Sequence, residues 1–232
     1  CVHCRDLGFI SFLVPLGHPK FGKATPCPHC VLGQGHLNRR ADLLLKRAGV
    51  PDAYRALSFD SFAALPEEQK QGKLLALHAL WALAQNPEKG ISLRDVVAQE
   101  TNINPEAFPA HHAPWLMLYG GLGMGKTGLA AAFVNQIVLT GVDVLFYRLQ
   151  ELFVEIQSRY GESGMADDTQ ERISRTQVLV LDECNVPTNP NGTASVDKRR
   201  ILEEICRFRH ARRLPTVFTG NLDQAAFTRM WG

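Results

Sequence analysis

A glycine-rich loop between two apolar segments constrains this chain more than any other feature. The loop, GGLGMGKT at residues 120–127, fits the pattern G-x-x-x-x-G-K-[ST]. The apolar run at 115–119 is typical of a buried strand, and apolar residues recur at helical spacing over 129–138. A strand, a glycine loop and a helix in this order predict a phosphate-binding loop. A glycine-rich turn without a ligand is the alternative.

The residue types of this loop suit a nucleoside triphosphate. Glycines let backbone N–H groups approach phosphate oxygens, and the N-terminus of the following helix adds partial positive charge. We expect Lys126 to contact the β and γ phosphates of ATP, and the Thr127 hydroxyl to bind Mg²⁺. The candidate residues for binding ATP or ADP are Gly120, Gly121, Gly123, Met124, Gly125, Lys126, Thr127 and Gly128.

Two later strands are expected to bring polar side chains to the same place. The apolar run at 177–181 ends in Asp182 and Glu183, which indicates a buried parallel strand that delivers two carboxylates to one edge of the sheet. Asp182 would hold Mg²⁺ and Glu183 would polarise the attacking water. The strand predicted at 214–219 leads to Asn221, beside the phosphates. The alternatives are an acidic turn for the carboxylates and a turn cap for Asn221.

Strands alternate with helices along the rest of the chain. Strands are predicted at 115–119, 142–146, 177–181 and 214–219, and helices at 37–48, 67–84, 129–138, 150–160 and 196–211, with a polar loop at 161–169. This order predicts an α/β fold of the P-loop NTPase type, with a mostly parallel sheet covered by helices on both faces.

Four of the six cysteines form two C-x-x-C pairs near the start of the sequence, namely Cys1, Cys4, Cys27 and Cys30. Two such pairs predict a tetrahedral Zn²⁺ site in a small zinc-ribbon module whose folding depends on the metal. A redox dithiol, chance pairing and ligation by His3 or His29 are the alternatives. We therefore predict a zinc module at 1–36, a helical linker at 37–50 and an ATPase domain at 51–232. Cys184 and Cys206 are expected to be buried thiols.

Positive charge is concentrated although the net charge is only +2. Residues 198–213 contain seven Lys and Arg against two Glu, which favours contact with a polyanion. The candidate nucleic-acid contacts are Arg199, Arg200, Arg207 and Arg209, with Phe153 and Tyr160 stacking on bases. A solvated helix face or a subunit interface is the alternative. No apolar run reaches the ~18 residues that span a bilayer, so no membrane association is expected.

The combination of these motifs resembles the DnaC/DnaI-type replicative helicase loaders, which are AAA+ ATPases, and their IstB-like relatives in transposition. The resemblance rests on the cysteine pairs, the segment RAGVP at 47–51 followed by Phe59 and Phe62, the glycine loop, the run LVLDE at 179–183 and the tripeptide TGN at 219–221. It extends over nearly the whole chain.

The resemblance implies an AAA+ module that binds and hydrolyses ATP between neighbouring subunits. Lys126 and Thr127 would hold phosphates and Mg²⁺, Asp182 and Glu183 would be the Walker B pair, and Asn221 would be sensor 1. Phe59 and Phe62 would pack near the adenine. The zinc module would dock on a hexameric replicative helicase, and a ring or spiral of ATPase domains would hold single-stranded DNA. An arginine finger and a helical lid are expected beyond residue 232.

The implied function is loading of a replicative helicase onto single-stranded DNA in the cytoplasm of a bacterium, by a host or a phage protein. Two other functions remain open. One is an IstB-like helper ATPase of transposition. The other is a zinc adaptor in which ATP serves only as structure, although a structural site has no need of the acid at Glu183.

Overall fold

The computed structural model of this chain describes residues 3–4, 9–11, 24–29, 34–62, 76, 79–80, 83, 115–139, 142–158, 165–185 and 193–231. Near the start, strands β1 (Phe9–Ser11) and β2 (Ala24–Pro26) form a short antiparallel pair. Helix α1 (Gln34–Ala48) follows, and then two turns of 3₁₀ helix at Asp52–Tyr54 and Phe59–Phe62.

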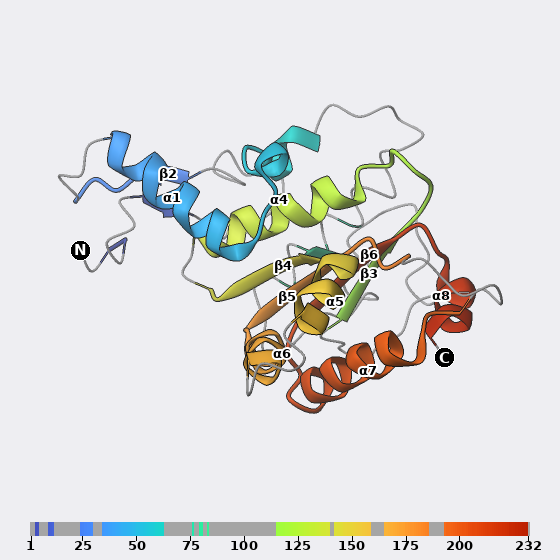
Figure 1. Cartoon of the computed structure of the whole chain (residues 1–232). Helices are drawn as coiled ribbons and strands as arrows, with labels where there is room; N and C mark the ends of the chain where they lie inside the picture. Colours follow the sequence, from blue (N-terminus) through green and yellow to red (C-terminus); the bar gives the residue numbers. More distant parts are fainter. Residues whose placement is uncertain are drawn as a thin grey trace.

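At the centre of the molecule, the described residues form a parallel sheet of four strands (Figure 1). They are β3 (Trp115–Tyr119), β4 (Val144–Arg148), β5 (Val178–Asp182) and β6 (Thr216–Gly220). Their order across the sheet is β3-β6-β5-β4, and every neighbouring pair is parallel. All residues of β5 and β6 are buried, as expected of central strands in a parallel sheet.

Helices cover both faces of the sheet. Helix α4 (Lys126–Val138) and α1 pack on one face. Helices α5 (Leu149–Ser158), α6 (Met165–Arg175), α7 (Val196–Ala211) and α8 (Gln224–Trp231) lie on the other (Figure 1). Successive residues of β5 alternate between the two cores: Val180 lies in the core under α4, and Leu179 and Leu181 lie in the other core. This arrangement confirms the predicted α/β fold with a parallel sheet.

Gly49 explains how the first helix joins this sheet. Helix α1 ends in a Schellman arrangement, in which the N–H of Gly49 donates to Lys46 O at 3.0 Å and that of Val50 to Leu45 O at 3.1 Å. Gly49 has a φ of 84°, and a Cβ there would lie 2.4 Å from the carbonyl oxygen of Phe146 in β4. Only glycine allows the chain to turn this close to the edge strand.

The structure corrects the predicted loop at 161–169, because α6 begins at Met165. Glycine and serine at 161–164 indicated a loop, but Asp168, Glu171 and Arg172 are exposed on a helix whose Ile173 is buried. The helix predicted at 67–84 lies mostly outside the described residues. The four of its residues that are described are helical, and three of these are buried. The connection at 86–114 lies outside them entirely.

Candidate nucleotide-binding site

The phosphate loop (residues 120–127) connects β3 to α4 as predicted. Gly123 and Gly125 have φ values of 73° and 80°, which residues with a Cβ rarely adopt. Helix α4 begins at Lys126, and Gly125 at its N-cap provides no side-chain hydrogen bond. The N–H groups of the first helical turn therefore have no side-chain cap at this position, which is the arrangement that binds anions at helix N-termini.

The side chain of Lys126 lies over the start of the phosphate loop. Its ammonium group donates to Gly120 O at 2.9 Å and to Gly121 O at 2.7 Å. Burial lowers the pKa of Lys126, and the negative charge of Asp182 opposes this shift. The amine is therefore held at the loop, within the electrostatic influence of the acid that ends β5.

Asp182 joins the phosphate loop to the centre of the sheet. Its side chain is fully buried, and its Oδ1 accepts hydrogen bonds from Thr127 Oγ1 at 2.9 Å and from Thr219 Oγ1. Oδ2 of the same carboxylate is buried and has no partner among the described residues. The sequence predicted that Thr127 and Asp182 meet, and they do.

This geometry fits a magnesium ion. Mg²⁺ prefers oxygen ligands and retains several waters, so one or two protein oxygens suffice. Asp182 Oδ2 is a buried carboxylate oxygen without a partner among the described residues. The Thr127 hydroxyl donates a hydrogen bond to Oδ1 of the same carboxylate. These two side chains are the ones that would hold the ion.

A pocket lies beside the phosphate loop, and Glu183 and Asn221 line it from the ends of β5 and β6. Glu183 has a φ of 55°, and its carboxylate lies 3.9 Å from Nε of Arg148 at the end of β4. The N–H of Asn221 donates to Oδ1 of Asn185 at 3.3 Å. The sequence singled out neither Arg148 nor Asn185. Asn185 stands only three residues after Asp182, and that spacing was the available signal.

The pocket between these groups has a volume of about 600 Å³. Tyr54, Leu57 and Phe62 line its apolar side, and Phe62 is the predicted adenine contact that the structure brings to the pocket. A Cβ on Gly128 would lie 3.3 Å from the side chains of both Leu57 and Phe62, so the start of α4 packs closely on this segment. The side chain of Phe59 is outside the described residues.

Asn135 of α4 fixes the apolar side of the pocket. Its buried amide donates to Tyr54 O and to Leu57 O, both at 2.8 Å, and to Arg55 O at 3.3 Å. This one side chain therefore holds the backbone that presents Tyr54 and Leu57. No pattern in the sequence indicates this role, because a single asparagine within an apolar helix is not distinctive.

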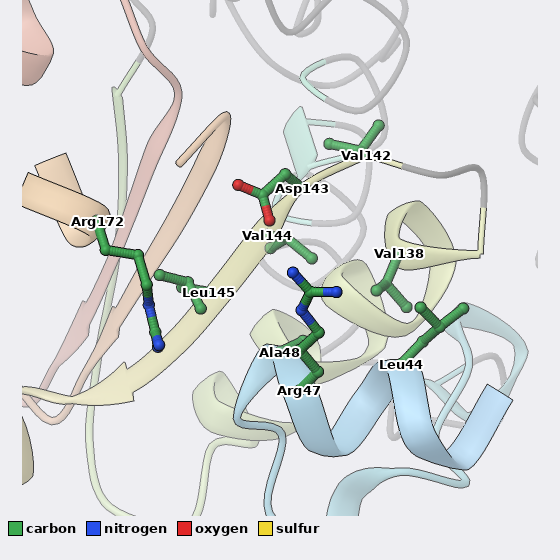
Figure 2. Close-up of a pocket in the computed structure, with 9 residues that line it drawn as sticks. All are labelled: Leu44, Arg47, Ala48, Val138, Val142, Asp143, Val144, Leu145 and Arg172. Atoms are coloured by element: carbon green, nitrogen blue, oxygen red, sulfur yellow. The ribbon is translucent and has the colours of Figure 1, made fainter. Parts of the chain in front are cut away.

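A second pocket, of about 330 Å³, lies between α1 and β4 (Figure 2). Arg47 of α1 and Arg172 of α6 line it together with Asp143, over an apolar floor that includes Leu44 and Val138. No residue of the phosphate loop lines this pocket. Lys126 and Thr127, the side chains expected to contact a triphosphate and its Mg²⁺, line the other pocket.

The structure contradicts two of the predicted nucleic-acid contacts. Arg209 is fully buried, where it donates to the carbonyl groups of Ile173, Ser174, Thr176 and Pro215. Phe153 is also fully buried, on the face of α5 that packs against the sheet. Neither side chain can reach a bound strand. Helical spacing places Phe153 in line with Leu149, Leu152 and Ile156, and this spacing was the overlooked signal.

The other predicted contacts differ in exposure. Arg200 and Arg207 are exposed on α7. Arg199 is partly buried, and its Nε has no acceptor among the described residues. Tyr160 lies outside the described residues.

Of the two isolated cysteines, Cys184 is buried, which agrees with the prediction, and burial raises the pKa of its thiol. Cys206 is only partly buried, and burial raises its pKa to about 11.

The predicted zinc module is described only in part. Cys4 and Cys27 are both buried, and the rings of His3 and His29 stack with their centroids 4.1 Å apart, so the two C-x-x-C segments lie side by side. Cys1 and Cys30 are outside the described residues. Within the described part of the chain no three potential metal ligands gather, and no helix is long and apolar enough to cross a membrane.

The fold and the site together are those of a P-loop nucleotide-binding protein. Residues 107–216 match the family described as IstB-like ATP binding protein. The replicative helicase loader DnaC of Escherichia coli K12 is 27% identical over 114 residues, which are 49% of this chain and 44% of DnaC. These matches confirm the resemblance that the motifs indicated, and the chain spans under half the length of this curated relative.

Solved structures show the same fold. A crystal structure of the DnaC helicase loader aligns with a TM-score of 0.58 and 19% identity, covering 78% of this chain and 90% of that one. A crystal structure of DnaI aligns with a TM-score of 0.54 and 19% identity, covering 78% of this chain and 77% of that one. The chain is therefore similar to helicase loaders in both sequence motifs and architecture.

Proposed function

We propose that this protein is an ATPase that loads a replicative helicase onto single-stranded DNA. The observation that carries the proposal is the hydrogen bond between Thr127 and Asp182, which sets a phosphate loop against the two acids at the end of β5. The similarity to DnaC supplies the helicase as the proposed partner. This function belongs in the cytoplasm of a bacterium, whether the protein comes from the host or from a phage.

The proposed chemistry is attack of water on the γ-phosphate of ATP. The N–H groups of the phosphate loop and the Lys126 ammonium would bind the phosphates and stabilise the charge that spreads over the transferred group. Mg²⁺ held by Thr127 and Asp182 would neutralise charge on the phosphate oxygens. Glu183 would orient the attacking water and accept its proton, and Asn221 would bind the water or the γ-phosphate.

Self-association through this site is part of the proposal. Two apolar side chains at the phosphate loop are exposed, Tyr119 at 61% and Leu122 at 85%. Leu122 lines the mouth of the nucleotide pocket. A neighbouring subunit that covered this mouth would bury both side chains, which is the arrangement expected for ATP bound between subunits.

Contact with single-stranded DNA is proposed for the exposed basic side chains of α7 and the turn after it. Arg200, Arg207, Arg212 and Arg213 are exposed there. Arg207 also forms an ion pair with Glu203 at 2.9 Å, in which 80% of the arginine side chain is exposed. Such an exposed ion pair is weak, so a DNA phosphate can replace Glu203 as the partner of Arg207. Arg209 and Phe153 are not part of this surface.

Binding to a helicase tests the proposal. We expect an immobilised hexameric replicative helicase to retain the protein in the presence of ATP, and deletion of residues 1–35 to abolish retention. The reason is that the N-terminal module is the proposed docking element. If the protein does not bind the helicase and instead binds duplex DNA together with a transposase, the loader function is rejected in favour of the IstB-like alternative. The family match is the observation that keeps this alternative open.

A zinc ion is proposed for the N-terminal module. Metal analysis is expected to give about one Zn²⁺ per chain, because two C-x-x-C pairs complete a tetrahedral set. The Cys27→Ser variant is expected to lose most of this zinc, and Cys206→Ser, which alters a thiol of α7, is expected to retain it. A parent protein without zinc would contradict the site, and so would a Cys27→Ser variant that kept all of its metal.

A further inference from the structure

The two carboxylate oxygens of Asp182 have different surroundings. Oδ1 accepts hydrogen bonds from two hydroxyl groups, Thr127 Oγ1 at 2.9 Å and Thr219 Oγ1. Oδ2 is buried and has no partner among the described residues. Two donors on one oxygen fix the rotation of the carboxylate, so the other oxygen has a defined direction in which to meet a cation.

Thr219 also binds the backbone of Glu183, the residue that follows Asp182. Its hydroxyl oxygen accepts from the N–H of Glu183 at 3.2 Å, and its carbonyl oxygen accepts from the N–H of Cys184 at 2.8 Å. Glu183 has a φ of 55°, a backbone conformation that persists only where neighbouring groups hold it. The bond to Thr219 is therefore one of the contacts that aim the Glu183 side chain.

The direction of these bonds follows from the groups involved. A backbone N–H can only donate, and an ionised carboxylate can only accept. The single hydroxyl hydrogen of Thr219 therefore goes to Asp182, while a lone pair of its oxygen receives the Glu183 N–H. A serine reproduces both contacts, whereas a valine of nearly the same shape provides neither. Thr219 is 1% exposed, so solvent cannot replace its hydroxyl.

We propose that Thr219 is a positioning residue that links the proposed magnesium-binding acid to the proposed water-polarising acid. This inference rests on the proposed ATPase function. One hydroxyl at the tip of β6 orients the side chain of Asp182 and the backbone of Glu183 together. It stands two residues before Asn221, so the strand that ends near Asn221 also sets the geometry of both acids.

The test compares Thr219→Val, Thr219→Ser and the parent in ATP binding and hydrolysis as Mg²⁺ is varied. Residues that orient metal ligands typically change metal affinity by about 10–100-fold when replaced. We expect Thr219→Val to need about 10–100-fold more Mg²⁺ for half-maximal binding of a fluorescent ATP analogue. Its binding of the analogue in EDTA should equal that of the parent. Thr219→Ser should match the parent in both measurements.

Three outcomes would overturn the inference. One is a folded Thr219→Val variant with the parental Mg²⁺ requirement, since a purely structural role would lower its melting temperature and leave the Mg²⁺ titration unchanged. Another is a serine variant as impaired as the valine variant. If the valine variant does not fold, Thr219→Ala replaces it in the test. The third contradicting outcome is then a Thr219→Ala variant that has the parental Mg²⁺ requirement. A parent without Mg²⁺-dependent ATP binding would instead reject the proposed function itself.

Discussion

Replacing Glu183 with glutamine is expected to leave ATP binding unchanged and to lower the turnover of ATP by about 100-fold or more, because a general base typically contributes a factor of this size. Glutamine has nearly the shape of glutamate and tolerates the same backbone conformation, so the fold is expected to persist. It cannot accept a proton from water. The Glu183 side chain is 58% exposed and lines the nucleotide pocket, which allows it to reach the attacking water.

Glu151→Gln is the matched control for this prediction. Glu151 stands in the first turn of α5, and its carboxylate lies 3.6 Å from Nη1 of Arg148, the same arginine that lies near Glu183. Glu151 does not line the nucleotide pocket. It therefore shares the charge environment of Glu183 without the proposed chemistry, and its substitution is expected to leave turnover within about 2-fold of the parent, as for a surface change away from the site.

Two measurements separate binding from chemistry. Titration with a fluorescent ATP analogue reports affinity, and phosphate release reports turnover. Lys126→Ala is expected to fail in the titration itself, because it removes the positive charge at the phosphates. Equal turnover in Glu183→Gln and the parent would remove Glu183 from the mechanism. A parent that binds ATP and releases no phosphate, alone or with helicase and DNA, would reduce the proposal to a structural nucleotide site.

The phosphate loop and the strands of the sheet could be predicted because they depend on local patterns. The loop has a fixed spacing from Gly120 to Thr127, and the continuous apolar run at 178–181 identified a central strand. The meeting of Thr127 with Asp182 followed from parallel topology, since the carboxyl ends of parallel strands share one edge. These inferences needed no knowledge of side-chain packing.

Other parts of the site depend on packing that the sequence does not encode locally. The bonds that Thr219 makes to Asp182 and Glu183 require β6 to lie beside β5, and Asn135 reaches a segment about 80 residues earlier in the chain. By contrast, the errors at Phe153 and Arg209 came from weighing residue type above periodicity. On α7, the buried Leu202 and Ile205 stand at helical spacing from Arg209, so the pattern itself placed that arginine on the inner face.

Arg209→Met is expected to destabilise the fold by about 3–5 kcal/mol, because it leaves several buried acceptors without a donor and each of them costs about 1–3 kcal/mol. The guanidinium is completely buried, and it donates to Thr216 Oγ1 at 2.9 Å and to Pro215 O at 2.6 Å. It also donates to the carbonyl oxygens of Ile173, Ser174 and Thr176, at 3.1, 3.3 and 2.8 Å. Burial lowers its pKa to about 10, so the group is charged at neutral pH.

The expected loss comes from the acceptors that methionine leaves behind. Helix α6 ends at Arg175, so the carbonyl groups of Ile173 and Ser174 belong to its last turn, where no intrahelical partner is available. Arg209 satisfies them from α7 and at the same time binds the start of β6. Methionine fills much of the same volume but donates no hydrogen bond, and each buried acceptor without a partner costs about 1–3 kcal/mol.

Arg207→Met is the control, because Arg207 lies on the same helix and is 80% exposed in its pair with Glu203. Its substitution is expected to change the free energy of unfolding by less than about 0.5 kcal/mol. Urea denaturation of the two variants and the parent measures both effects. In a DNA-binding assay the order should reverse: Arg207→Met should weaken binding, and folded Arg209→Met should bind as the parent does. Equal stability of the two variants would mean that Arg209 does not connect α6, α7 and β6 as the structure describes.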